Sequence, residues 1–156
     1  MDYPLATPDE LARARAVIDA WLDDARRDNP AVAAVETGDP EGAIARWFVR
    51  LRGEQKDVFT IWLTLGQRTL RYETYVMPAP EENEAELYAH LLRRNHGLHG
   101  AAFEIGAEEG IFLRGQLGVR HVDEAEIDRI VGSLYAYTEQ YFRPAMRIGF
   151  ASRFRG

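Results

Sequence analysis

The sequence has no cysteine, and Lys56 is its only lysine among 156 residues. Without cysteine the chain has no disulfide framework, no thiolate zinc site and no cysteine nucleophile. This composition fits a reducing cytoplasm, which is the location we predict. The other basic residues are all arginine, a bias that we attribute to a GC-rich genome.

Long apolar runs are also missing. None approaches the roughly 20 residues of a membrane span. The start, Met1-Asp2-Tyr3-Pro4, is acidic and lacks the apolar core of a signal peptide. Apolar residues still make up 46% of the chain, which is enough for a core and too much for a disordered chain. We therefore predict a single domain over residues 1–156 with no membrane partner.

Acidic residues are missing from the C-terminal segment of the chain. Residues 143–156 contain four arginines and no acid, so residues 1–142 carry a net charge of −10 against −6 for the whole chain. An acidic body argues against nucleic acid as a partner, because binding to the phosphate backbone needs a basic surface. The basic segment is a disordered terminus, a docked tail or a gate over a binding face. Its apolar residues favour docking, namely Met146, Ile148, Phe150 and Phe154.

Motifs for catalysis are absent. The two serines, Ser133 and Ser152, lie in no nucleophile elbow. Acid pairs such as Glu81-Glu82 and Glu108-Glu109 fit solvated turns and helix starts better than an acid–base pair, which needs a pocket. The glycine spacings match neither a P-loop nor a dinucleotide fingerprint. We predict no catalytic residues, no cofactor and no enzyme activity.

Three histidines offer the best candidate for a metal or small-molecule site. They are His90, His96 and His99. Imidazoles bind zinc when three or four ligands are held in a fixed geometry. These histidines straddle a predicted helix end and a loop, so capping and turn roles are the competing interpretation. A sensor that uses the His90–His99 region remains our alternative function, although we assign no metal ligand.

Capping signals predict three helices. The first begins after Thr7, with Glu10 completing a capping box. The second uses Asn83 with Glu86, and it should end in a left-handed cap at Asn95-His96-Gly97. The third begins after Asp123 with Glu126 as return partner, and Pro144 should stop or kink it. The buried stripe expected on the second helix is Leu87, Tyr88, Leu91 and Leu92.

Apolar runs between turn residues predict five strands, at residues 43–52, 57–65, 69–77, 101–105 and 110–118. The first alternates in polarity, and the second is apolar on both faces apart from its threonines, which is typical of a central strand. Residues 31–42 are predicted to be a loop, with turn chemistry at Gly38-Asp39-Pro40. The fold class is therefore α+β, in the order α-β-β-β-α-β-β-α, with an antiparallel sheet packed by helices.

Aromatic residues fall on both faces of the first three strands. One face should take the helices, whereas the other mixes aromatics with arginine. That second face is either another core layer under the last helix or an interface, where aromatics and arginine are enriched. An exposed sheet edge could also accept a partner strand. Our candidates for a peptide or dimer interface are Arg46, Trp47, Phe48, Trp62, Arg71 and Tyr75.

The later part of the chain carries a family resemblance. It combines Leu92-Arg93-Arg94-Asn95, Gly100-Ala101-Ala102-Phe103, Ile111-Phe112-Leu113-Arg114-Gly115 and a closing Gly149-Phe150-Ala151-Ser152. This pattern resembles the YbjN family in its actinobacterial form. The resemblance implies a fold like that of type III secretion chaperones, which are small acidic proteins, often dimers, that hold an unfolded client segment. It implies no catalytic residues.

The function expected from these features is non-enzymatic binding of a polypeptide, in a chaperone-like or regulatory role. The partner would be an unidentified protein client, bound through a sheet face or a sheet edge. The resemblance also leads us to expect that the chain forms a homodimer. The alternative remains a small-molecule or metal-binding sensor at His90–His99.

Overall fold

A computed structural model describes residues 2–38 and 44–154 of the chain. The described residues form three α-helices and six strands in the order α-β-β-β-β-α-β-β-α, with short 3-10 segments between β5 and β6, between β6 and α3, and after α3. The elements are α1 (Pro8–Asp28), β1 (Val32–Thr37), β2 (Ala45–Arg52), β3 (Val58–Leu65), β4 (Thr69–Met77), α2 (Glu84–Asn95), β5 (Ala102–Ile105), β6 (Ile111–Gly118) and α3 (Glu124–Gly149). The α+β class predicted from the sequence is confirmed.

The strands form one antiparallel sheet in the order β1-β2-β3-β4-β6-β5. The first four strands make a meander, as expected for sequential strands with short turns. Strand β1 is a correction, because residues 31–42 were predicted to be a loop. Its six residues lack the long alternation of the other strands, and pairing with β2 holds them in place despite a bulge after Val32. Residues 39–42 of the expected loop lie outside the described chain.

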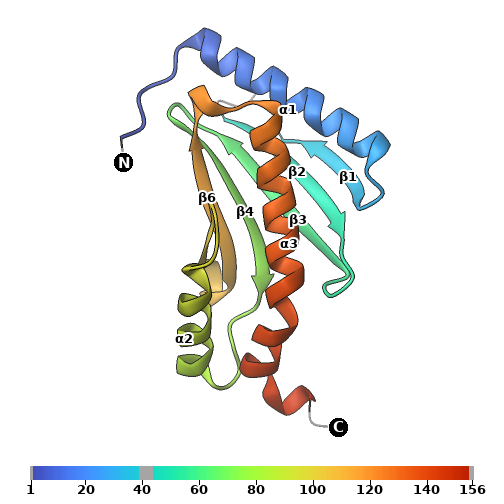
Figure 1. Cartoon of the computed structure of the whole chain (residues 1–156), viewed down its shortest axis with the longest axis vertical. Helices are drawn as coiled ribbons and strands as arrows, with labels where there is room; N and C mark the ends of the chain where they lie inside the picture. Colours follow the sequence, from blue (N-terminus) through green and yellow to red (C-terminus); the bar gives the residue numbers. More distant parts are fainter. Residues whose placement is uncertain (1, 39–43, 155–156) are drawn as a thin grey trace.

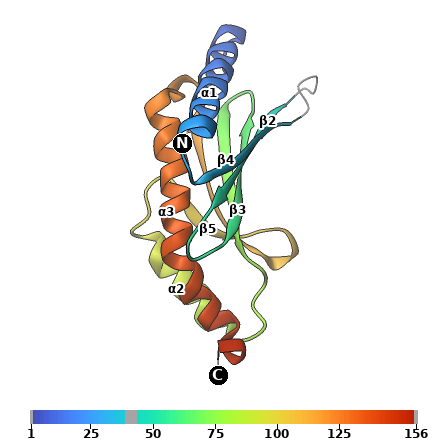
Figure 2. The ribbon, with the colours of Figure 1, turned by 90° about the vertical axis from the view of Figure 1, so that its right-hand side faces the viewer.

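All three helices lie on one side of the sheet (Figure 1). The view along the sheet in Figure 2 shows them together on that side, with the opposite side left bare of helices. We call the first side the covered face and the second the uncovered face. The covered face holds the core, where Ile61, Leu63 and Leu113 are fully buried between strands and helices. Among the described residues, no helix is both long and apolar enough to cross a membrane.

The helix starts follow the sequence in part. Thr7 and Glu10 form the predicted capping box on α1. Asp123 caps α3 by accepting the Glu126 N–H at 2.8 Å, but the Glu126 carboxylate binds Arg129 instead of the cap backbone. Asn83 makes no side-chain cap on α2. It adopts a left-handed conformation, and its amide donates to the Ile148 carbonyl at 3.0 Å, which ties α2 to the end of α3.

Two other predictions for the helices are wrong. The left-handed residue after α2 is Gly100, at a φ of 73°, and not a residue of Asn95-His96-Gly97. Leu92 was placed in the buried stripe, yet 67% of it is exposed, while Leu87 and Leu91 are buried. Leu92 directly follows Leu91, so the helical rotation carries it out of the narrow contact with α3.

Helix α3 runs through Pro144 to Gly149, so the proline does not stop it. A proline in a helix removes one hydrogen bond, and the following residues are held by other contacts. The Gly149 carbonyl accepts the Glu81 and Glu82 N–H groups at 2.9 and 3.1 Å. A Cβ on Gly149 would lie 3.0 Å from the Pro80 side chain, so the close approach at this point favours glycine.

The described part of the basic segment contacts acidic residues. Residues 143–149 complete α3, and Ala151–Phe154 add a 3-10 turn. Arg153 forms an ion pair with Glu81, and the Ser152 hydroxyl donates to Glu82 at 2.9 Å. Phe150 is 5% exposed. These contacts hold the end of the described chain against the loop that leads into α2.

Candidate functional site on the uncovered face

The strand register aligns polar side chains across the uncovered face. Arg46 pairs with Thr64, Thr64 with Arg71, and Arg71 with Gln116. These four residues form one row, from β2 through β3 and β4 to β6. Because side chains alternate along a strand, the neighbouring row on the same face lies two residues away on each strand. That second row contains Phe48, Trp62, Glu73 and Arg114.

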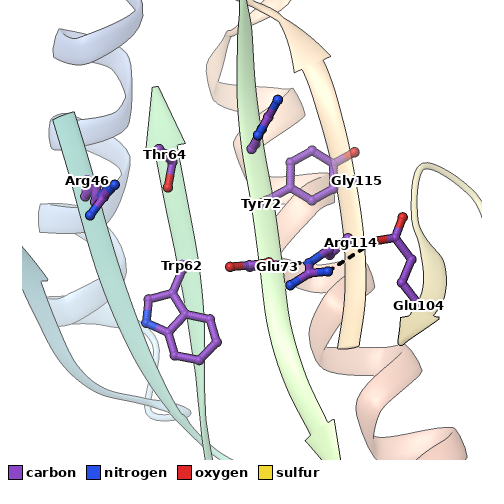
Figure 3. Close-up of a pocket in the computed structure, with 9 residues that line it drawn as sticks. Arg46, Trp62, Thr64, Tyr72, Glu73, Glu104, Arg114 and Gly115 are labelled. Atoms are coloured by element: carbon purple, nitrogen blue, oxygen red, sulfur yellow. Dashed lines mark hydrogen bonds and ion pairs between the residues drawn. The ribbon is translucent and has the colours of Figure 1, made fainter. Parts of the chain in front are cut away.

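The face is hollowed where the two rows meet. A cavity of about 520 Å³ lies over β3 and β4, and a second of about 440 Å³ shares its wall toward Phe112. Figure 3 shows the strands that supply the lining, with Arg46 on β2, Trp62 on β3 and Glu73 on β4. We call this region the sheet hollow. Its lining in the larger cavity is Arg46, Trp62, Thr64, Arg71, Tyr72, Glu73, Glu104, Arg114 and Gly115.

In the sheet hollow, the positive charge of Arg114 is paired with carboxylates. Its guanidinium binds the Glu73 carboxylate and lies 3.4 Å from Glu104 (dashed lines in Figure 3). It also stacks on Phe112, with 4.4 Å between the guanidinium carbon and the ring centroid. Burial acts to lower the pKa of Arg114, but the hydrogen bonds and charges of Glu73 and Glu104 outweigh burial and raise it. Arg114 therefore has both carboxylates of the sheet hollow as partners.

Arg46 and Arg71 differ from Arg114. Both are exposed, and no described residue forms a hydrogen bond or an ion pair with either guanidinium. They flank Thr64 on the two neighbouring strands. The half of the sheet hollow over β2–β4 thus has two cations without a described counter-charge.

Five of the six interface candidates lie on the uncovered face, in agreement with their strand positions. They are Arg46, Phe48, Trp62, Arg71 and Tyr75, which alternate with buried residues along β2, β3 and β4. Tyr75 lies beyond the hollow and packs edge-on against Phe112, with 5.4 Å between ring centroids. Burial and the Glu108 charge raise the pKa of Tyr75.

Trp47 is a correction. It lies on the covered face with 1% exposure, and its indole N–H donates to Asp19 of α1 at 2.8 Å. Its neighbours two positions away, Ala45 and Val49, are also buried. The period of two along this strand therefore already separates Trp47 from Arg46 and Phe48. Its burial excludes this side chain from an interface on the uncovered face.

The prediction from sequence missed Thr64, Arg114 and Glu104 as members of the site. Thr64 could have been found from its alternation with Trp62 on β3. Arg114 and Glu104 could not, because β6 and β5 reach the sheet only after α2, and their register is not encoded in the pattern of a single strand. The pairing of β4 with β6 places Arg114 opposite Glu73.

The sequence matches a known protein family over most of its length. Residues 14–145 fit the YbjN family, described as "Putative bacterial sensory transduction regulator". The chain belongs to the YbjN family. The matched region includes all six strands and therefore the complete sheet hollow.

Mycobacterial relatives support the assignment. This YbjN-family chain is 34% identical over 113 residues to an uncharacterized protein of Mycobacterium tuberculosis strain H37Rv, covering 72% of this chain and 62% of the relative. An uncharacterized protein of Mycobacterium leprae is 31% identical over 116 residues, covering 74% and 62%. The chain thus spans less than two thirds of the length of these curated relatives. Their names state no activity.

The histidines of the alternative function do not converge. His96 and His99 are exposed, while His90 is half-buried on α2. Burial, followed by the charges of Arg94 and Arg93, lowers the pKa of His90, and its buried Nε2 has no partner among the described residues. Over residues 2–38 and 44–154 there is no group of three or more side chains suited to hold a metal ion. The geometry gives the His90–His99 region no shared site.

A second, apolar hollow lies at the β5 edge of the sheet. It has a volume of about 500 Å³ between α2 and β5, with Leu92 and Ile105 exposed on its rim. The outer edge of β5 is already engaged, because the Asn95 side-chain amide accepts the Phe103 N–H at 2.6 Å and donates to the Phe103 carbonyl at 3.3 Å. Asn95 thus blocks the addition of a strand at Phe103.

Proposed function

We propose that this YbjN-family chain is a regulatory, non-enzymatic protein that binds a polypeptide on the uncovered face of its sheet. The observation that carries the proposal is the sheet hollow itself. It lies on the side of the sheet opposite all three helices, and arginine, tryptophan, threonine and glutamate side chains line it. Arginine and aromatic residues are the types enriched where proteins bind one another.

The chemistry of the sheet hollow supports binding over catalysis. Its two carboxylates, Glu73 and Glu104, both contact Arg114 and are thereby held in ion pairs. General acid–base catalysis instead uses a carboxylate or imidazole with an unusual environment and a partner to which it passes a proton. The family's description as a regulator agrees with a role that depends on binding.

Placing a photo-cross-linker on each side of the sheet would test this proposal. Trp62 would be replaced by p-benzoylphenylalanine, and a matched variant would carry the same residue at Trp21, which is half-buried on α1. Both variants of the 156-residue chain would be irradiated in extract of the native cell. We expect polypeptide adducts from the Trp62 position and few from the Trp21 position. Equal adducts at both positions, or none at Trp62, would contradict the proposal.

A homodimer is part of the same proposal and needs its own measurement. Light scattering gives the mass of the purified chain. If the adducts at the Trp62 position are dimers of the chain itself, the uncovered face is an interface between two copies. Adducts with other polypeptides, together with a dimeric mass, would place the second copy elsewhere on the molecule.

A further inference from the structure

We propose that the polypeptide bound by the sheet hollow presents a carboxylate to Arg46 and Arg71, two residues away from an aromatic side chain that packs on Trp62. This inference rests on the proposed function, because it names the chemistry of the partner for the same hollow. The partner segment is acidic and extended, and it runs in the direction of β2 and β4, which gives it the pattern acid-x-aromatic.

The first step is the position of the two arginines. Arg46 and Arg71 lie on β2 and β4, on either side of Thr64 on β3. Neighbouring strands are about 4.8 Å apart, so the two backbones are about 10 Å apart across the row. Two long side chains at this separation can reach one group held above the Thr64 hydroxyl.

The second step is the distribution of charge. Arg114 is paired with Glu73 and Glu104, whereas no described residue pairs with Arg46 or Arg71. Three arginines and two glutamates line the sheet hollow, which is thus net positive in a chain of net charge −6. A guanidinium offers a planar fork of donors that matches a carboxylate, so the complementary group on an extended polypeptide is an Asp or Glu side chain.

The third step is the neighbouring aromatic pair. Phe48 and Trp62 are directly opposite each other on β2 and β3 and are half-buried, in the row next to Arg46 and Thr64. The two rows are two residues apart along the strands, which is about 7 Å. Residues i and i+2 of an extended peptide share one face at the same spacing. An acid over Thr64 therefore places the i+2 side chain over Trp62 when the peptide runs in the direction of β2 and β4, from Arg46 toward Phe48.

Synthetic peptides would test the acidic group directly. Short serine-rich peptides would carry Glu-Thr-Phe, Gln-Thr-Phe or Glu-Thr-Ser at their centre. Their binding to the 156-residue chain would be measured by fluorescence anisotropy. We expect the Glu-Thr-Phe peptide to bind at least about tenfold tighter than the Gln-Thr-Phe peptide, because a charge-assisted hydrogen bond is lost. Added salt should reduce this preference.

Variants of the two arginines would test whether they cause the preference for Glu over Gln. Arg46→Gln and Arg71→Gln should each remove most of the Glu-over-Gln preference. Arg15→Gln is the matched control, since Arg15 is exposed on α1 and far from the uncovered face. All three side chains are exposed, so we expect the thermal unfolding midpoint to stay nearly unchanged.

The outcomes separate this inference from the proposed function. Equal affinity for the Glu-Thr-Phe and Gln-Thr-Phe peptides, lost together in Trp62→Ala, would overturn the acidic partner while supporting a polypeptide site. A Glu preference that survives in both arginine variants would also overturn it. Absence of binding to all three peptides would count against the inference, and adducts confined to the Trp62 cross-linker would still leave the proposed function standing.

Discussion

The two faces of the sheet hold tryptophan side chains in opposite environments. Trp47 on β2 is buried against α1 and donates a hydrogen bond to Asp19. Trp62 on β3 is half-buried and lines the sheet hollow beside Arg46. The two strands are neighbours, so only the alternation of side chains separates the two environments. The covered face therefore buries its tryptophan in the core, while the uncovered face leaves its tryptophan partly open to solvent.

Truncating the two tryptophans should give the largest contrast between the faces. Trp47→Ala removes a fully buried side chain and leaves Asp19 without its partner, so the free energy of unfolding should fall by about 3–5 kcal/mol. Trp62→Ala should lower it by only about 1 kcal/mol. Urea unfolding, followed by circular dichroism, measures both. Similar losses for the two variants would show that the uncovered face also belongs to the core.

Much of the covered face could be predicted from the sequence. The alternation of Trp47, Val49 and Leu51 with polar or arginine neighbours identifies which side of β2 is buried, and the Thr7–Glu10 capping box fixes the start of α1. These signals are local, since they depend on residues a few positions apart. β1 was missed because its short, weakly alternating segment becomes a strand through pairing with β2.

The sheet hollow was predictable only in part. Arg46, Phe48, Trp62 and Arg71 follow from strand alternation. The pairing of Glu73 with Arg114 depends on β6 lying next to β4, and the two strands are separated in the chain by α2 and β5. The register of β4 against β6 therefore decides which arginines have a carboxylate partner. A sequence pattern alone does not distinguish Arg71 from Arg114.

Glycine at position 115 should matter for packing around Tyr72, which is buried opposite it on β4. A Cβ there would clash with the Gly100 carbonyl oxygen and with the Tyr72 ring. Tyr72 lies in this space, and its hydroxyl donates to the same carbonyl at 2.6 Å. Gly115→Ala should therefore destabilise the fold by about 1–3 kcal/mol through overpacking.

Gly132→Ala is the matched control for Gly115→Ala. Gly132 is exposed on α3 and has no atom within 4 Å of its Cβ position. Alanine favours the helix, so this variant should gain about 0.5–1 kcal/mol. Thermal unfolding of both variants gives the two signs. If Gly115→Ala were neutral, the close packing of Tyr72 against Gly115 would contribute nothing to stability.

The Lys56 amine lies on the side of the covered face, and burial lowers the pKa of this amine to about 8. The amine donates to the Tyr75 and Val76 carbonyls at 2.7 and 2.9 Å and lies 5.5 Å from the centre of the Phe142 ring. The usual lysine pKa is 10.5, so between pH 8 and 10.5 the unfolded chain binds a proton that the native chain has released. Stability should therefore rise with pH across this window.

A Lys56→Met variant isolates this effect, because the tyrosines titrate in both proteins. The unfolding free energy of the wild type, minus that of the variant, should increase from pH 8 toward pH 10.5. Since Lys56 is the only lysine, its ¹⁵N resonance also reports the native pKa directly. A titration midpoint near the usual lysine value would mean that water reaches the amine freely and that this part of the covered side is open.

The smallest expected effect on stability belongs to the uncovered face. Glu73→Gln breaks the ion pair with Arg114, but both side chains are about one third exposed, and such pairs are worth less than about 1 kcal/mol. Glu104→Gln removes the same charge at a longer contact of 3.4 Å with Arg114, so its effect on stability should be smaller still. Glu73→Gln also leaves Arg114 with one carboxylate partner, so the sheet hollow becomes more positive. The Glu-Thr-Phe peptide should then bind more tightly while the unfolding midpoint hardly changes. A large loss of stability with weaker binding would instead make Glu73 a structural support of the uncovered face, and the division between the two faces would fail at this residue.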